Sequence, residues 1–211
     1  MGLINDIGLI KSKNSKTVFI FEKIFPNFFN ISYRSPREYI SICWDEYKKN
    51  YPEENVGING KVFELCIATL LIREKILPFY MQAKVAFVPN VEYDFIFYSK
   101  EIGPICISAK TSLRERYKQA DLEAIALKYV HRKSKSYLFT LSESESRSIK
   151  DKIKNGDVIG LDESIYVISN EFDAIIKYLK GLKFCIAPNV NIIESDTIVT
   201  NEKINSILFS A

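Results

Sequence analysis

One stretch of the sequence brings a lysine to the end of an apolar strand. Residues 104–123 begin as a short apolar run that ends at Lys110, and a segment rich in charged side chains follows. Ser112 and Glu115 have the spacing of a capping box, S-x-x-E, which predicts that a helix begins here. Lys110 is therefore expected at a strand-to-helix junction, where α/β folds expose functional side chains.

Three carboxylates are candidates to act with this lysine: Glu64, Asp94 and Glu123. Asp94 lies in an apolar run that reads as a strand, where an unpaired buried charge would be costly, so the pattern favours a ligand role. Carboxylate and backbone oxygens together bind hard divalent cations such as Mg²⁺. With Lys110 to stabilise charge or position a water molecule, this set predicts metal-assisted hydrolysis of a phosphodiester.

The triplet Arg114, Glu115 and Arg116 suits the recognition of G·C base pairs. Arginine makes paired hydrogen bonds to O6 and N7 of guanine, and a carboxylate accepts from N4 of cytosine. The positive end of a helix also disfavours arginines, so an anionic or guanine partner would compensate for their position. The triplet therefore predicts base reading in a major groove.

Each of these side chains also has a purely structural interpretation. Lys110 could extend from a strand end into solvent, as lysines usually do. Glu64 lies in the first turn of a predicted helix, where a carboxylate meets the helix dipole favourably. Glu115 could serve only the capping box, and the arginines beside it could form a solvated face. The residues alone leave these alternatives open.

The elements that must position these groups follow from the hydrophobic periodicity. Helices are predicted at 36–49, 61–77, 113–131, 144–154 and 171–182, with a loop at 51–60. Strands are predicted at 80–88, 93–98, 105–109, 136–141 and 157–169. The short connections between the first three strands favour an antiparallel meander. This order indicates an α/β (α+β) protein with a mixed central sheet flanked by helices.

The composition is that of one domain. The 211 residues are 47% apolar, which is enough for a single sizeable core. We divide the predicted domain into an N-terminal helical or arm region at 1–59, a catalytic core at 60–182 and a C-terminal tail at 183–211. The net charge of +3 is a mild bias that does not by itself imply a nucleic-acid partner.

Cysteine usage and hydropathy limit the setting. The four cysteines are scattered, with no C-x-x-C pair and one histidine in the chain, which argues against zinc and favours buried reduced thiols. The N-terminal segment lacks the continuous apolar run of a signal peptide. No window approaches the roughly 18 apolar residues of a membrane span. We therefore expect an intracellular protein with no membrane partner.

The features in this order resemble the PD-(D/E)XK nuclease superfamily over about residues 60–170. The core of that superfamily has an acidic first helix, a meander that carries one acid and a (D/E)xK tripeptide, then a helix and further sheet. Asp94 matches the first acid, although Tyr93 replaces the proline that precedes it. The tripeptide is Ser108-Ala109-Lys110, in which serine takes the place of the second acid.

The run from Lys110 to Gln119 resembles the type II restriction endonucleases that cut before CCGG and CCNGG-like sites. In that branch a glutamate from the following helix replaces the missing acid, and an R-(D/E)-R cluster reads C·G pairs. The matching positions here are Glu123 and the triplet at 114–116. The resemblance implies that Mg²⁺ is held by Asp94, Glu123 and the backbone carbonyl of Ala109.

The same resemblance implies the partners and the setting. Glu64 would support the metal ligands without binding the metal itself. The substrate would be double-stranded DNA with a palindromic site. A palindrome calls for two-fold symmetry, so a homodimer is expected. We also expect a cognate DNA methyltransferase in the same system and a location in the cytoplasm of a prokaryote. Two other functions remain open: a structure-specific or repair nuclease on the same core, and a DNA-binding module without catalysis.

Overall fold

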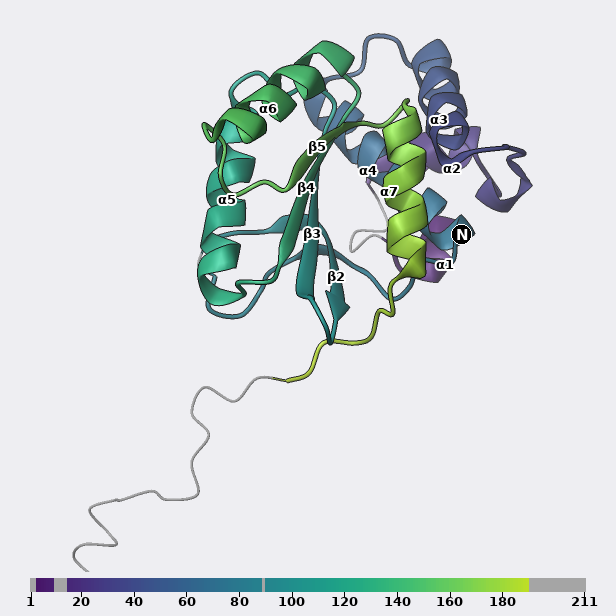
Figure 1. The fold of residues 1–211 in the computed structure, drawn as a ribbon. Coiled ribbons are helices and arrows are strands. Elements are labelled where there is room, and N and C mark those ends of the chain that lie inside the picture. The colour runs from purple at the N-terminus through teal and green to yellow at the C-terminus, as the bar shows by residue number, and fades with distance from the viewer. Residues whose placement is uncertain (1–2, 10–14, 89, 190–211) are drawn as a thin grey trace, which may run out of the picture.

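The computed structural model of the chain is built around one five-stranded sheet with helices on both faces (Figure 1). It describes residues 3–9, 15–88 and 90–189. The strands are β1 (Tyr80–Ala83), β2 (Tyr93–Ser99), β3 (Gly103–Lys110), β4 (Lys135–Thr140) and β5 (Glu163–Tyr166). The helices are α1 (Leu3–Ile7), α2 (Lys16–Ile24), α3 (Pro36–Asn50), α4 (Val56–Arg73), α5 (Arg116–Val130), α6 (Glu143–Asn155) and α7 (Asn170–Gly181), with a 3₁₀ turn at Phe28–Asn30.

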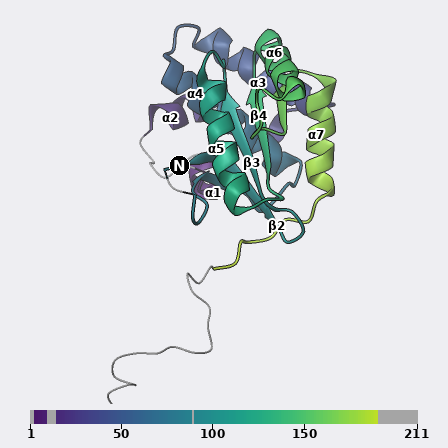
Figure 2. The ribbon, with the colours of Figure 1, turned by 60° about the vertical axis from the view of Figure 1, so that its left-hand side comes forward.

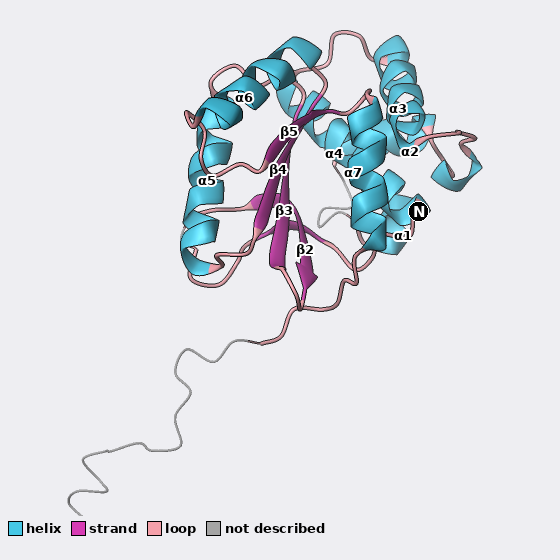
Figure 3. Cartoon of the chain, in the orientation of Figure 1, coloured by secondary structure: helices cyan, strands magenta, loops and turns pink. Residues whose placement is uncertain are grey.

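The sheet is mixed, as the sequence predicts. Its strands lie in chain order, with β1, β2 and β3 antiparallel and β3, β4 and β5 parallel. The parallel pairs need crossover connections, and α5 and α6 supply them (Figure 3). The predicted fold class, α/β (α+β) with an antiparallel meander, is confirmed. Because β3 and β4 run in parallel, both end at the same edge of the sheet, next to the start of α5.

Two helical layers cover the sheet (Figure 2). On one face, α4 packs against β3 and α7 against β5, and this side holds the largest cluster of buried apolar residues. On the other face, α5 packs against β4 through Ala120 and Ala124, and Leu113 from the preceding turn and Ile149 from α6 join the same cluster. Side chains alternate along β3, so Ile105, Ile107 and Ala109 join the core under α4. Ser108 and Lys110 therefore face the α5 side.

The helix α4 is longer at its start and shorter at its end than the predicted helix at 61–77. It begins at Val56, inside the predicted loop at 51–60, because the side chain of Asn55 caps it by accepting a hydrogen bond from the N–H of Ile58 (2.9 Å). The glycines in this segment weaken the helical pattern in the sequence, but the burial of the helix along most of its length outweighs their low propensity.

Three further boundaries differ from the prediction. The strand expected at 80–88 ends at Ala83, and the chain turns at 86–87. The helix expected from Leu113 begins at Arg116, and the capping box is wrong: Ser112 is not the N-cap, and the N-cap Glu115 makes no side-chain capping bond. The strand with a turn expected at 157–169 is shorter, since β5 covers only Glu163–Tyr166. The remaining elements match the predicted ranges more closely.

Three of the predicted buried thiols, Cys43, Cys66 and Cys106, are buried, whereas Cys185 is partly exposed. No described helix is both long and apolar enough to cross a membrane. The predicted C-terminal tail lies outside the described residues from 190 onwards, as does Pro89 in the connection between β1 and β2.

Candidate active site

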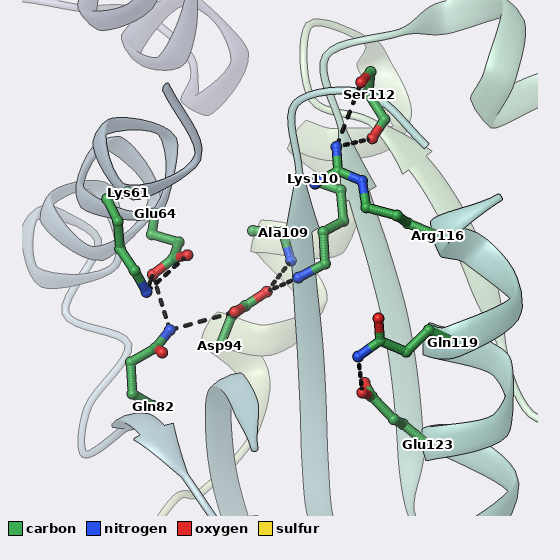
Figure 4. Close-up of polar contacts among 10 residues, drawn as sticks. All are labelled: Lys61, Glu64, Gln82, Asp94, Ala109, Lys110, Ser112, Arg116, Gln119 and Glu123. Carbon is green, nitrogen blue, oxygen red and sulfur yellow. Dashed lines mark hydrogen bonds and ion pairs between the residues drawn. The ribbon is translucent and has the colours of Figure 1, made fainter. Parts of the chain in front are cut away.

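Asp94 and Lys110 form an ion pair at the edge of the sheet where β3 ends (Figure 4). The Oδ2 atom of Asp94 accepts hydrogen bonds from Nζ of Lys110 (2.8 Å) and from the backbone N–H of Ala109 (2.8 Å). The register between β2 and β3 is continuous up to the pair Phe95 and Ile107, and beyond it the Asp94 side chain takes the place of a ladder acceptor. The side chain of Asp94 is 12% exposed, and the backbone N–H of Ala109 fixes its position on the sheet.

Glu64 joins this pair through Gln82. The Nε2 atom of Gln82 donates to Oε2 of Glu64 (2.9 Å) and to Oδ1 of Asp94 (3.3 Å). Nζ of Lys61, one turn earlier on α4, also donates to Glu64 (3.0 Å). Figure 4 shows the resulting chain of contacts from α4 across to β3. Three of the four predicted catalytic residues, Glu64, Asp94 and Lys110, are thus connected in one network.

Glu123 approaches the same edge from α5. Its Oε1 atom accepts a hydrogen bond from Nε2 of Gln119 (2.7 Å), and its backbone carbonyl accepts from the hydroxyl of Tyr93 (3.0 Å). Tyr93 precedes Asp94 on β2, so its phenol ties the helix at Glu123 to the strand that carries Asp94. Figure 4 shows Gln119 and Glu123 extending from α5 on the side of the strands. Within the described part of the chain, no hydrogen bond joins Glu123 to Asp94.

The pKa values of Glu64 and Glu123 are both raised, and a cation bound beside them would oppose this rise. Burial raises the pKa of Glu64, the negative charge of Asp94 raises it further, and Lys61 and Lys110 oppose the rise. Burial also raises the pKa of Glu123, with Gln119 and Lys110 acting against the rise and Asp94 adding to it. Asp94 therefore lies close enough to both glutamates for their charges to repel.

Replacing Glu64 by glutamine is expected to stabilise the fold at neutral pH. A carboxyl whose pKa is raised by folding loses stability as pH rises from its ordinary value, about 4.3, towards the folded value. The neutral amide avoids that loss. We expect a gain near 1 kcal/mol at pH 7.5, or about 2–4 °C in Tm, which disappears below about pH 4. Calorimetry from pH 4 to 8 would measure it, and a lower Tm at pH 7.5 would contradict it.

The turn between β3 and α5 is held by a residue from α6. The carboxylate of Glu145 accepts from the backbone N–H of Leu113 (2.8 Å, at Oε2) and of Arg114 (2.9 Å, at Oε1). Arg114 has a left-handed backbone (φ 43°), which an L side chain adopts at some cost. Although burial raises the pKa of Glu145, the two N–H groups outweigh it, and the pKa is lowered overall. Glu145 therefore holds the turn that leads into α5, at N–H groups other than those the predicted capping box would have bound.

Removal of this contact is expected to loosen the turn. Replacing Glu145 by alanine leaves two N–H groups without their charged acceptor and should lower the free energy of unfolding by about 1–3 kcal/mol. The effect should shrink as pH falls below about 4, since protonation removes the charge in the wild type. Urea unfolding measures it. Glu143→Ala is the control, because its exposed ion pair with Arg147 contributes about 0–1 kcal/mol; equal losses would refute the role of the turn contact.

The triplet predicted to read bases lies outside the core. Arg114 and Glu115 are exposed, and Arg116 is partly buried. Arg116 donates to the carbonyl and hydroxyl oxygens of Ser112, and Glu115 forms an ion pair with Lys118. These are local contacts at the surface, where exposed pairs contribute little, so their exchange for contacts to a partner costs little.

The residues of this edge fit a hard divalent cation by their chemistry. Asp94, Glu123 and the carbonyl of Ala109 offer oxygen donors of the type that Mg²⁺ prefers. Oδ1 of Asp94 is held only by the longer contact with Gln82, which leaves it capacity to accept. Among the described residues, no group of three or more acidic, histidine or cysteine side chains is arranged to hold a metal ion. The fit therefore rests on two carboxylates and one backbone oxygen.

The fold is restriction-endonuclease-like. The chain is similar to restriction endonuclease PspGI, whose structure was solved in complex with substrate DNA, with a TM-score of 0.58 over 81% of this chain and 83% of that chain. The sequences are 16% identical, so the similarity is one of fold. No family model matches the sequence, and no curated protein matches it significantly.

Sequence reasoning missed several residues of this edge. Gln82, Gln119 and Lys61 each donate to a predicted catalytic carboxylate, and Glu145 holds the turn. Gln119 and Lys61 lie four and three residues before their glutamates, a helical spacing that could have signalled the contacts. Gln82 carries no such signal, because its contact depends on the register of β1 against β2.

Proposed function

We propose that this protein is a Mg²⁺-dependent type II restriction endonuclease that hydrolyses double-stranded DNA at a palindromic site containing G·C pairs of the CC/GG type. The observation that carries the proposal is the partly buried ion pair of Asp94 and Lys110 at the sheet edge, with Glu123 two turns into the next helix. The restriction-endonuclease-like fold supports it. This edge of the sheet would then combine hydrolysis and base reading in one strand-helix unit.

The roles of the chain's own residues follow from their chemistry. Asp94, Glu123 and the Ala109 carbonyl would hold Mg²⁺, which supplies charge neutralisation at the phosphate and lowers the pKa of a bound water. Lys110, fixed by Asp94, would orient the attacking water and stabilise the negative charge that develops on the phosphate oxygens. Water adds its oxygen to phosphorus, the bond from phosphorus to the bridging oxygen breaks, and the leaving oxygen takes up a proton.

Recognition would come from the triplet that follows the lysine. Arg114 and Arg116 would donate to guanine and Glu115 would accept from cytosine. Glu64 would support the ligands through the Gln82 contact. A palindromic target would be met by a homodimer, and the enzyme would work in a prokaryotic cytoplasm beside a methyltransferase that protects the same site.

The test is to incubate the protein with mixed-sequence plasmid and Mg²⁺ and to sequence the fragment ends. Discrete fragments whose ends share a G·C-containing palindrome are expected, with none in EDTA. Smeared products would refute sequence specificity. Cleavage confined to junctions, nicks or flaps would instead identify a structure-specific nuclease. Salt-dependent duplex binding that Mg²⁺ never converts to cleavage would identify a DNA-binding module.

A further inference from the structure

The side chain of Gln82 lies between two buried carboxylates from different elements (Figure 4). Its Nε2 atom is 2.9 Å from Oε2 of Glu64 and 3.3 Å from Oδ1 of Asp94. The other oxygen of Asp94, Oδ2, is already bound by Lys110 and the N–H of Ala109. Gln82 is therefore the group that fixes the remaining oxygen of Asp94, the one available to a cation.

The residue that makes these two contacts, Gln82, has a strained backbone. In the register of β1 and β2, Met81 pairs with Phe95 and Ala83 with Tyr93, so Gln82 lies opposite Asp94. Gln82 has φ 47°, a left-handed conformation that an L residue adopts at a cost and that an extended strand does not need. Such strain in a strand beside an active-site carboxylate suggests a functional constraint.

The chemistry of an amide suits this place. A glutamine NH₂ group has two donors and no charge, so it can hold two carboxylates together without competing electrostatically with a cation. The chain contains two glutamines, and the second, Gln119, donates to Glu123. Neutral amide donors therefore contact both carboxylates that the proposed function assigns to Mg²⁺.

We infer that Gln82 is a positioning residue that orients Oδ1 of Asp94 towards the cation and links it to Glu64. The inference rests on the proposed function and names a residue beyond its catalytic set. Gln82 acts through Asp94 and touches no reacting atom. Its loss should weaken cation binding, while a role confined to the fold would change only stability.

Two variants separate these roles. Gln82→Met keeps a chain of similar length without donors, and Gln82→Gly removes the amide and the left-handed strain together. Circular dichroism must show that both variants are folded under the binding conditions, so that weak cation binding by them cannot follow from unfolding. Lys75→Gly is the control, because Lys75 is exposed at the end of α4 and has a similar backbone (φ 58°).

Binding of Mn²⁺ to each variant, followed by electron paramagnetic resonance, tests the inference alongside plasmid cleavage. Both Gln82 variants should bind Mn²⁺ about 10- to 100-fold more weakly than the wild type, the range expected for groups behind metal ligands, and Lys75→Gly should bind like the wild type. Unchanged affinity in both Gln82 variants, with a wild type that binds Mn²⁺ and cleaves, would overturn this inference alone. A wild type that neither binds nor cleaves would overturn the proposed function, and this inference with it.

Discussion

Replacing Lys110 by methionine is expected to lower kcat for DNA cleavage by about 10²- to 10³-fold or more, because the variant loses a prepositioned cation at the developing phosphate charge. The ammonium is held at 2.8 Å by Asp94 and cannot be replaced by a mobile surface lysine. Lys110→Arg should also lose most activity, since a planar guanidinium cannot occupy the same point. Single-turnover cleavage of a fragment with one mapped site would measure both variants.

The control for this loss is Lys183→Met. Lys183 is exposed and lies near Cys185, whose N–H donates to the carbonyl of Tyr98 at the opposite end of the β2 and β3 pair. The Lys183→Met substitution removes one positive charge from the chain and leaves the sheet edge at Lys110 unchanged. Methionine at 110 also deprives Asp94 of its partner, so circular dichroism must show that the variant is folded. Activity of a folded Lys110→Met protein within a few-fold of the wild type would refute the catalytic role.

The parts of this edge that the sequence predicts are those encoded locally. Lys110 ends an apolar run and Asp94 interrupts another, and strand periodicity puts each of them near the end of a strand. Their meeting then requires only that adjacent strands of a meander pair, which short connections favour. Both features depend on neighbours in the chain, and the ion pair of Asp94 and Lys110 is found in the structure.

The parts that escape prediction depend on contacts distant in sequence. Ser112 and Glu115 have the spacing of a capping box, yet Glu145 from α6 binds the backbone N–H groups of the turn instead. The S-x-x-E spacing therefore does not form its cap, and a contact from a distant helix holds the turn, which includes the left-handed Arg114. The role of Gln82 likewise appears only once the register of β1 is known. Asn55 begins α4 within a segment whose glycines read as a loop.

The two glutamates of the edge are expected to respond very differently to the same substitution. Glu123→Gln should lower cleavage by about 10³-fold at moderate Mg²⁺ and shift the Mg²⁺ requirement upwards, because it removes a charged ligand. Glu64→Gln should cost about 10- to 100-fold, as expected for a group that acts through others. Titrating Mg²⁺ in single-turnover assays of both variants would measure the difference. The same change is made at both positions, so each variant loses one charge and keeps the shape of its side chain.

The ranking of the two variants decides which helix supplies the second acid. Ser108 on β3 faces the α5 side with Lys110 but carries no charge, so under the proposed function the second acid comes from α4 or from α5. Glu123 accepts from Gln119 through Oε1 alone, whereas both carboxylate oxygens of Glu64 accept from Lys61 and one of them also from Gln82. Glu123 is therefore freer to bind a cation. A larger loss in Glu64→Gln than in Glu123→Gln would reverse this assignment and make α4 the source of the ligand.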